Sequence, residues 1–567
     1  MFVHLLCWLT LTITPSFGAV WFVPDDFATP QAALDNSSSE DTVVLRDGTY
    51  LGPIMLPQHS ITLGSESILD EDTVHIAACR VIPDSGAMTR RCLDTPEEAV
   101  DSVYVRIIGL TIADARCTGN DSWGGGLRLR YRTAYVSDCV FEECLATRGG
   151  ATYLEQSEAY FSSCTFRLND ALSSGRVLRG LQSTVVFANC DVGPSGYLAD
   201  DPSTEAEFVL DDCEFKFLHG RIHGLGTSAQ GRVTALSLID RSLCDSIVFR
   251  NCTIDSNAFS QFFSGGSHGG MRNLLLDSCR IIGNTVAYGF LVASDFDSLR
   301  RVVITRCAFE GNRRPGPQFG GAGLLTFDGT CDDASCDSLL LADCRFHDNE
   351  GGAFSCVQVN GDADPAAFRL RRNSFTANRN FNVTSPPGGA VFTSSLDSGI
   401  FERNAFHGNI GHAFDTWEFG ATGHAVLSWW GDATGPYEPV SNPTSLGDTT
   451  DQHTVYDPWL LSEEQIFDSV AEAGNYLPSP TLPFLTNAYP NPFNSSVTIE
   501  FVLSKDQDIA LEVFDLIGRR VETICNGRMR KGVHVRNWIP NGKASGIYFA
   551  KLSGDDIAST VKMLYLK

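Results

Sequence analysis

Two adjacent aspartates and a histidine are the strongest candidates for acid–base chemistry in this 567-residue chain. Asp211 and Asp212 are followed closely by His223. Paired carboxylates near a histidine could protonate a leaving oxygen and activate a water molecule. The same pair directly precedes Cys213, however, and polar residues directly before a cysteine recur along the chain. A catalytic role and a purely structural role are therefore both open, and the second is favoured.

Other polar and aromatic groups give weaker signals. The stretch Ser267–Gly270 contains His268, but no acid or nucleophile accompanies it. Loop aspartates could bind calcium, although their spacing matches neither an EF-hand nor a calcium-binding nonapeptide repeat. These loop acids are Asp332, Asp333, Asp362 and Asp364. The pair Trp429-Trp430 could stack on a sugar, but closing the end of a core is the favoured role. We therefore expect no cofactor, with calcium as the one alternative.

A short phrase recurs ten times between Val136 and Asn409: an apolar strand, a polar residue, Cys or Asn, any residue and a bulky apolar residue. Successive copies are 23 to 39 residues apart. Repeats of this size without helical periodicity predict a parallel β-solenoid, in which each coil stacks on the previous one. The marker residues are Cys139, Cys164, Cys190, Cys213, Cys252, Cys279, Cys307, Cys344, Asn373 and Asn404.

Within one copy the apolar and polar residues alternate with a period of two, as in Leu274–Ile281. A strand with one face in a core and one in water needs this alternation. Because equivalent residues of stacked strands lie about 4.8 Å apart, we expect the eight cysteine markers to form a buried ladder of thiols. Metal binding is the alternative, but none of the eight has a partner at CxxC spacing.

Asparagine recurs five residues after the marker in seven copies. Asparagine tolerates the left-handed backbone conformation of a sharp corner. Stacked amides can also hydrogen-bond to the copies above and below. We expect these residues to form corners and not a catalytic array. They are Asn169, Asn257, Asn284, Asn312, Asn349, Asn378 and Asn409.

The coils resemble right-handed parallel β-helix repeats of the pectate-lyase-like superfold, which implies an all-β fold for residues 19–474. The start resembles the superfold's usual opening, with a short capping helix at Pro30–Leu34, a strand at Thr42–Leu45 and a turn at Asp47–Tyr50. The aromatic-rich stretches Leu427–Pro439 and Val455–Leu461 are similar to its usual ending. Both caps are needed, because an open end exposes unpaired strand edges.

Enzymes of this superfold cleave acidic polysaccharides. A lyase of this kind needs carboxylates that hold calcium and a basic Arg or Lys, and a hydrolase needs two or three carboxylates. Asp211-Asp212 and His223-Gly224 resemble the paired Asp and Gly-His-Gly of polygalacturonases. The Asn-Thr-Asp and Arg-Ile-Lys elements of that family do not appear in suitable places. This departure puts a catalytic role for Asp211, Asp212 and His223 in doubt.

The first residues, Met1–Gly18, read as a secretory signal, because an uncharged apolar run ends in Pro15 and a small-residue step. No later segment approaches the length of a transmembrane helix, so we expect an exported protein. Export permits disulfides. The candidates are Cys331 with Cys336 and Cys79 with Cys92, and a weaker one is Cys117 with Cys144.

Charge divides the chain at a proline-rich linker, residues 475–488. From Phe484 onward the chain has 11 basic and 8 acidic residues, and the remaining 31 basic and 60 acidic residues give the rest a net charge of −29. Such an acidic body argues against nucleic acid as a partner. Solubility is the plain explanation, and an acidic polysaccharide would be repelled unless calcium bridged the two.

The last unit, residues 489–567, alternates in longer strands separated by turns, which predicts a small antiparallel, immunoglobulin-like β-sandwich. It resembles the type A C-terminal sorting domain of the type IX secretion system. The matching motifs are Tyr489–Asn494, Val513–Arg519, Gly546–Phe549 and the final strand Lys562–Lys567. The resemblance implies that the secretion machinery is a partner and that the protein is secreted or held on the outer-membrane surface. A related accessory module without a sorting role is the alternative.

Two functions from different classes remain open. The favoured one is a non-catalytic surface scaffold that binds carbohydrate or another surface partner through loops on one side. The other is a polysaccharide lyase or glycoside hydrolase with an unfamiliar site, which rests on fold resemblance alone. Convergence of three or more ionisable groups in one groove would favour the enzyme, and scattered charges would favour the scaffold.

Overall fold

The protein is described from a computed structural model. It describes residues 18–565 apart from 87–89, 99–102, 120–121, 195–205, 226–233, 239–242, 265–269, 293–298, 314–323, 329–337, 351–355, 361–367, 380–387, 395–399, 417–422, 467–483, 490–492, 504–505, 516–518, 531, 541, 544–545 and 555–556. The expected signal segment, Cys331, Cys336 and most of the expected linker lie outside these residues. The chain forms two compact units, Met1–Asp468 and Ser469–Lys567.

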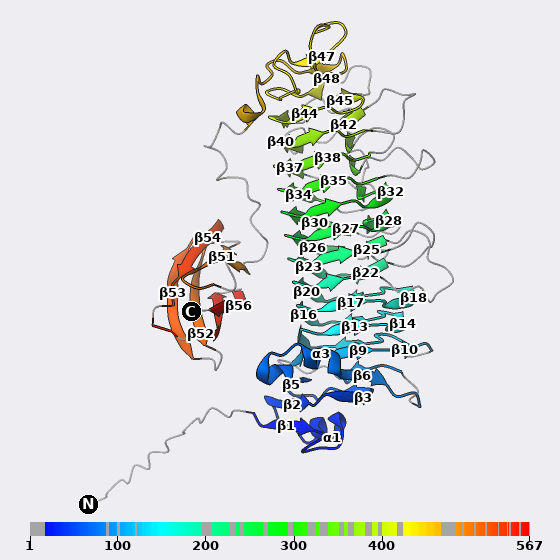
Figure 1. Cartoon of the computed structure of the whole chain (residues 1–567), viewed down its shortest axis with the longest axis vertical. Coiled ribbons are helices and arrows are strands. Elements are labelled where there is room, and N and C mark those ends of the chain that lie inside the picture. The colour runs from blue at the N-terminus through cyan, green and yellow to red at the C-terminus, as the bar shows by residue number, and fades with distance from the viewer. Residues whose placement is uncertain are drawn as a thin grey trace, which may run out of the picture. The chain divides into compact units, whose positions relative to one another are not determined.

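The first unit is a parallel β-solenoid whose strands stack in three long faces (Figure 1). Fourteen described strands form the first sheet: β1 (Val20–Val23), β2 (Asp41–Leu45), β5 (Ile61–Ser65), β8 (Tyr104–Ile108), β12 (Thr133–Ser137), β16 (Glu158–Ser162), β20 (Thr184–Ala188), β23 (Glu214–Leu218), β26 (Leu243–Arg250), β30 (Gly270–Asp277), β34 (Arg301–Thr305), β37 (Ser338–Ala342), β40 (Phe368–Arg371) and β43 (Ile400–Glu402).

The second sheet has thirteen described strands, which are shorter: β3 (Gly48–Gly52), β6 (Cys79–Pro83), β9 (Thr111–Ala113), β13 (Val140–Glu142), β17 (Thr165–Arg167), β21 (Asp191–Val192), β24 (Arg221–His223), β27 (Thr253–Asp255), β31 (Arg280–Ile282), β35 (Ala308–Glu310), β38 (Arg345–His347), β41 (Ser374–Thr376) and β44 (Ala405–His407). Apart from β6, which follows α2 and α3, each begins soon after a strand of the first sheet, because only two residues separate the two strands.

The third face is built from two consecutive sheets. The first, called the third sheet below, contains β4 (Ile54–Met55), β7 (Leu93–Asp94), β11 (Leu127–Arg130), β15 (Thr152–Glu155), β19 (Leu178–Leu181), β22 (Ala206–Asp211), β25 (Thr234–Leu238) and β29 (Phe263–Ser264). The other contains β33 (Leu291–Val292), β36 (Leu325–Asp328), β39 (Val357–Asn360), β42 (Gly388–Ser394), β45 (His412–Thr416), β48 (Gly447–Thr450) and β47 (Pro436–Tyr437).

Short strands complete the coils outside these faces; the first two groups lie between the second and third faces, and the last group follows the third face. They are β10 (Arg116–Cys117), β14 (Leu145–Arg148) and β18 (Asp170–Ser174), then β28 (Ala258–Gln261) and β32 (Thr285–Gly289), and finally β46 (Gly423–His424) and β49 (Thr454–Val455). The parallel solenoid predicted from the repeat is confirmed.

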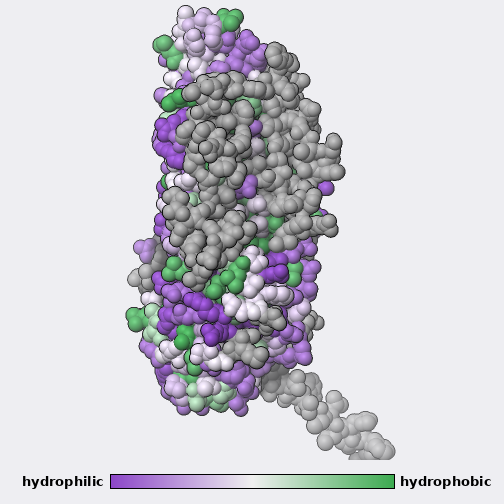
Figure 2. All heavy atoms as spheres, turned by 90° about the vertical axis from the view of Figure 1, so that its right-hand side faces the viewer, coloured by the Kyte–Doolittle hydropathy of each residue, from purple (hydrophilic) through white to green (hydrophobic). Residues whose placement is uncertain are grey.

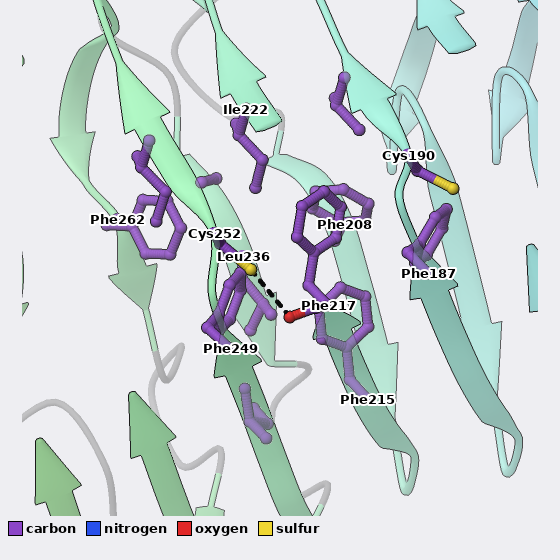
Figure 3. Close-up of a cluster of buried hydrophobic side chains, with 14 of the residues drawn as sticks. Phe187, Cys190, Phe208, Phe215, Phe217, Ile222, Leu236, Phe249, Cys252 and Phe262 are labelled. Atoms are coloured by element: carbon purple, nitrogen blue, oxygen red, sulfur yellow. Dashed lines mark hydrogen bonds between the residues drawn. The ribbon is translucent and has the colours of Figure 1, made fainter. Parts of the chain in front are cut away.

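The cysteine ladder is confirmed as well, because all eight marker thiols are at most 2% exposed. All eight belong to the hydrophobic cluster that fills the solenoid. Figure 3 shows Cys252, whose Sγ donates to the carbonyl of Phe217 at 3.0 Å, beside Phe249 and Phe215. Farther along, the rings of Phe309, Phe346 and Phe375 stack with centroids 4.8 Å apart at each step. Cysteine therefore occupies a narrow part of the interior beside a wide aromatic column.

The asparagines form the expected amide ladder. The side-chain amide of Asn284 donates to Asn312 Oδ1 at 3.0 Å, and that of Asn312 donates to Asn349 Oδ1 at 2.9 Å. Each amide also bonds the backbone of the preceding coil, as Asn312 does with the carbonyl of Ile281 at 2.8 Å. The ladder ends when Asn409 donates to the carboxylate of Asp448 at 2.8 Å.

The corner conformation differs from the expectation in one respect. The left-handed residue is the one before each asparagine and not the asparagine itself, for example Ser256 with φ 57° and Ala377 with φ 56°. The same holds before the markers, as at Asp138 with φ 55° and Asp212 with φ 50°. The backbone turns at the left-handed residue, and the side chain of the following asparagine or cysteine then points into the interior.

Both ends of the solenoid are covered. At the start, α1 (Pro30–Asp35) buries Pro30, Ala33 and Leu34, and the hydroxyl of Thr29 accepts from the N–H of Ala32. Two further helices, α2 (Ser67–Asp70) and α3 (Val74–Ala78), lie between β5 and β6. At the far end the Trp430 ring is fully buried and stacks on Phe406 at 4.8 Å. The 3-10 helix η3 (Glu463–Ile466) follows. The capping roles of Pro30–Leu34 and Trp430 are confirmed.

The expected pairing of Cys79 with Cys92 is not formed, and both residues are free buried thiols. Cys79 begins β6 in the second sheet, whereas Cys92 directly precedes β7 in the third. The two residues therefore belong to different faces of the coil. Burial raises the pKa of the Cys79 thiol to about 12. No disulfide joins Cys117 and Cys144, the weaker candidates, and both residues are buried.

The second unit has two antiparallel sheets with a common core. One contains β50 (Phe484–Tyr489), β51 (Val497–Leu503) and β54 (Gly532–Trp538), and the other β52 (Gln507–Asp515), β53 (Arg520–Met529), β55 (Gly546–Gly554) and β56 (Ile557–Tyr565). The antiparallel β prediction is confirmed, while its immunoglobulin-like assignment stays a prediction. Because β50 begins at Phe484, the sheet starts within the stretch expected to be linker.

Candidate functional site

The three sequence candidates do not converge. Asp211 ends β22 in the third sheet, Asp212 lies at the corner after it, and His223 ends β24 in the second sheet. The strand β23 of the first sheet separates Asp212 from β24. Asp211 therefore occupies a strand end and Asp212 a left-handed corner, as expected if the pair has a structural role.

Each of these candidates also has a local partner. Asp212 Oδ1 accepts from the backbone N–H of Leu243 at 2.8 Å, which ties one corner to the next coil. Asp211 lies 3.4 Å from the Arg179 guanidinium. His223 Nε2 lies 3.3 Å from Asp191 Oδ2. A shared acid–base pair is therefore not assembled from these residues.

The surroundings of His223 form an ionic ladder on the second sheet. Arg221 binds Asp255 through two contacts of 2.7 Å each, and this guanidinium is the main reason that the pKa of Asp255 is lowered. The coil register places Arg221 beside Asp191 and His223 beside Asp255. Opposite charges therefore alternate between neighbouring coils, an arrangement that stabilises stacked strands.

The outward side of the third sheet carries several charged side chains close together. We call its described members Arg128, Arg130, Tyr153, Glu155, Arg179 and Asp211 the polar face. The strand register stacks Arg128, Tyr153 and Arg179 in one ladder, and it aligns Arg130 with Glu155 in the next. The alternation of strands directs Leu127 and Leu129 into the core and the two arginines outward. Arg128, Arg130, Tyr153 and Arg179 are each less than a tenth exposed.

One carboxylate organises the start of the polar face. Asp94 accepts from Arg91 at 2.6 Å and from Arg128 at 2.8 and 2.7 Å, and Arg130 lies 3.7 Å away. Asp94 is 3% exposed. Three guanidinium groups around one buried carboxylate fix the positions of their donors, because the ion pairs and the strands hold both ends of each side chain.

An aromatic group lies next to this network. Trp123 is half-buried and packs against Tyr153, with ring centroids 5.2 Å apart. The exposed Arg148 lies over the other side of the Trp123 ring at 5.5 Å. Figure 2 shows the side of the β-helix that carries β10, β14 and β18, where described hydrophilic residues gather toward the N-terminal end beside a few hydrophobic ones.

The polar face combines hydrogen-bond donors with acceptors. Its guanidinium groups donate, its carboxylates accept, and Trp123 offers apolar surface at the edge. Burial, followed by the nearby Glu155 carboxylate, raises the pKa of Tyr153, so its hydroxyl stays protonated at neutral pH. Arg128, Arg130 and Arg179 were not singled out from the sequence. The alternation in Leu127–Arg130, with arginine at both outward positions, was the available signal.

A second ionic cluster lies near the N-terminal cap. Among the described residues, Asp47, Glu66 and His75 form the one group whose donor atoms could hold a metal ion, since these atoms lie within 4.8 Å of one another. His75 Nδ1 is 2.7 Å from Asp47, its Nε2 is 3.3 Å from Asp70, and Glu66 pairs with Arg46. Asp47 is the main cause of the raised pKa of His75. With both ring nitrogens and Glu66 already paired, the cluster is an ion-pair network that links α2 and α3 to the first coils.

The remaining sequence candidates fall mainly outside the described residues. This applies to His268 and to the loop acids Asp332, Asp333, Asp362 and Asp364. No helix in the described part of the chain is long and apolar enough to span a membrane.

Comparisons with known proteins agree with this architecture. Residues 204–417 match the family model described as right handed beta helix region, and residues 487–566 match the one described as secretion system C-terminal sorting domain. No curated protein matches the chain in a sequence search.

Two solved structures are among the matches. Pectate lyase Pel9A is 12% identical, with a TM-score of 0.20, and the match covers 67% of this chain and 76% of that one. The enzymatically active domain of bacteriophage CBA120 tailspike protein 4 is 10% identical, with a TM-score of 0.22, and the match covers 94% of this chain and 64% of that one. The stacked coils, the antiparallel C-terminal sheets and the two family matches together identify the chain as a right-handed parallel β-helix repeat protein with a C-terminal sorting domain of the type IX secretion system.

Proposed function

We propose that the protein is an exported β-helix scaffold that binds carbohydrate through the polar face without cleaving it. The sorting domain indicates export, with the protein either held at the cell surface or released. The solenoid is a suitable carrier, because its rigid coils present side chains at regular intervals along one face.

One observation carries the non-catalytic part of the proposal. Two carboxylates of the third sheet, one of them the sequence candidate Asp211, are held by arginines: Asp94 by Arg91 and Arg128, and Asp211 by Arg179. A general base must be able to take a proton from its substrate, and a carboxylate held among guanidinium groups is poorly suited to this role. The same fixed groups suit binding, since they need little reordering when a ligand arrives.

The mixed charge of the polar face favours a hydroxyl-rich ligand over a simple polyanion. Arg128, Arg130 and Arg179 alternate with Glu155 and Asp211, so both donors and acceptors are offered within a few coils. A sugar presents both kinds of group as well. Trp123 at the margin supplies the apolar contact that the flat side of a sugar ring needs.

A glycan-array screen of the full-length protein, with and without calcium, tests the binding part. Trp123→Ala and Arg148→Ala should weaken the strongest signal at least about tenfold, which corresponds to about 1.4 kcal/mol. Tyr135→Ala and Arg345→Ala are matched controls, because Tyr135 is 44% exposed on the first sheet and the Arg345 side chain is 58% exposed on the second. Equal losses in all four variants would contradict a site on the polar face.

Release of reducing ends or unsaturated products from a panel of uronate polymers tests the non-catalytic part. We expect the wild-type protein to release neither reducing ends nor unsaturated products. Product formation that disappears in Asp211→Ala, Asp212→Ala or His223→Ala would instead establish a polysaccharide lyase or glycoside hydrolase.

A further inference from the structure

Arg132 is a buried arginine at a corner whose backbone is firmly held. It lies between β11 and β12, directly after Tyr131, which has a left-handed φ of 54°. Its N–H donates to Ser157 Oγ at 3.2 Å, and its carbonyl accepts from the N–H of Glu158 at 2.9 Å. The residue is 3% exposed. The position of the side chain is thus set by the coil stack.

Only part of the guanidinium group of Arg132 is bonded. Its Nη1 donates to the carbonyl of Pro57 at 2.8 Å. Its Nε and Nη2 have no hydrogen-bond partner among the described residues. These two nitrogens form one edge of the guanidinium plane, the edge that binds a carboxylate or sulfate through two parallel hydrogen bonds.

The charge around Arg132 is unbalanced. Its charged neighbour is Arg130, which together with burial lowers the pKa of Arg132. Arg130 itself uses Nη1 for Glu97 at 2.8 Å and Nη2 for the carbonyl of Thr95 at 2.6 Å, while its Nε has no partner among the described residues. Burial of a guanidinium beside another cation is unfavourable unless an anion compensates it.

One exposed hydrogen bond joins the two residues that directly follow contacts of these arginines. Gln58 Nε2 donates to Glu98 Oε2 at 2.8 Å, and both side chains are exposed. Gln58 follows Pro57, the contact of Arg132, and Glu98 follows Glu97, the contact of Arg130. An exposed hydrogen bond between a neutral amide and a carboxylate breaks at low cost in free energy, so these two segments can separate locally.

We propose that Arg132, with Arg130 beside it, is a binding site for one oxyanion, a carboxylate or sulfate group, and that the Gln58–Glu98 contact is its closure. The site shares Arg130 with the polar face, whereas Arg132 and the Gln58–Glu98 contact lie outside the set of residues proposed to bind carbohydrate. It takes either a free inorganic anion or the acidic group of a sugar, since both offer two oxygens at the spacing of the guanidinium edge.

Titration calorimetry of the full-length protein with sodium sulfate and with glucuronate, at constant ionic strength, separates the two sources. Arg132→Met keeps the aliphatic stem and removes the charge, and Arg345→Met is the control on the second sheet. We expect the dissociation constant of the anion to be at least tenfold larger for Arg132→Met than for the wild type, and unchanged for Arg345→Met. Equal binding by the wild type and Arg132→Met, or no binding of either anion by the wild type, would overturn the proposal.

Hydrogen exchange gives a local readout that is independent of global stability. Sulfate should slow exchange at residues 54–60 and 94–98 in the wild type, but not in Arg132→Met. Gln58→Ala, which removes the closure, should speed exchange in the same segments without sulfate. Unchanged exchange in these segments on adding sulfate would also overturn the proposal.

Discussion

Single side chains hold neighbouring coils together at defined points. The asparagine ladder has its donors directed toward the C-terminal end, and at that end Asp448 accepts from the side chain and the N–H of Asn409 at 2.8 and 3.0 Å. A carboxylate is well placed there, because it meets the donor end of a polarised chain of amides. The ladder thus ends on a group that can accept but not continue it.

Asn312→Ala should destabilise the β-helix by about 3 kcal/mol, because a buried amide and two buried backbone groups lose their partners. Asn312 is fully buried and bonds Ile281, Asn284 and Asn349. Asn273→Ala is the control: its one bond, to the carbonyl of Asp245, is exposed. Denaturant unfolding followed by circular dichroism measures both. Similar losses in the two variants would contradict a structural role for the ladder.

The pH dependence of stability offers a second test at this scale. Burial raises the pKa of Asp448 above its usual value of 3.8. The folded state therefore binds this proton more tightly than the unfolded chain, so the contribution of Asp448 is largest below pH 3.8 and is lost as the pH rises through the folded pKa. Asp448→Asn should remove this pH dependence, but its amide nitrogen cannot accept from the N–H of Gly408 as the carboxylate does; Asp448→Ala, which loses all three bonds, should be less stable than Asp448→Asn. An Asn variant with the pH profile of the wild type would exclude Asp448 as the source.

The elements at the ends of the β-helix decide whether its coils stay soluble. Helix α1 covers the first coil with Ala33 and Leu34, which are at most 1% exposed. A solenoid without its cap presents unpaired strand edges and core to other chains. The cap is short, so single residues in it matter.

Leu34→Asp should uncover the first coil and cause association, visible as a rise in light scattering and faster exchange in β1 and β2. The control is Asp35→Asn, which changes an exposed residue at the end of the same helix. A monomeric Leu34→Asp protein with unchanged exchange would show that α1 is dispensable as a cap.

Sequence patterns predicted the elements that bury one face and expose the other. Strands with buried markers and caps with apolar clusters belong to this group. The strand β53 (Arg520–Met529) was missed, because its residues are exposed or half-buried throughout and no alternation is visible. The left-handed position before each asparagine was missed too, since residues as different as Leu168, Asp348 and Ala377 occupy it. The polar face was not predictable in full, because Tyr153 and Arg179 meet Arg128 only through the coil register.

At the scale of the whole molecule, the charge and the C-terminal unit define where the protein works. The residues before Phe484 carry a net charge of −29, which disfavours binding to anionic surfaces and to nucleic acid. The sorting domain supplies the route out of the cell. Its own basic excess and antiparallel sheets set it apart from the acidic, parallel body.

Deletion of residues 469–567 should leave the protein inside cells that possess the type IX system, while the full chain reaches the surface or the medium. Immunoblots of cell and medium fractions measure the distribution, with the exported Arg345→Ala protein as control. Export of the truncated chain at the level of the full chain would assign the last unit an accessory role and not a sorting role.

The most direct test of binding at the polar face is a hydrogen-exchange footprint of the full-length protein with the glycan that it retains best, combined with mass analysis of that glycan afterwards. We expect slower exchange in β11, β15 and β19 and near Trp123, with the glycan recovered at its original length. Protection confined to the second sheet around His223, or a shortened glycan, would contradict a carbohydrate-binding scaffold.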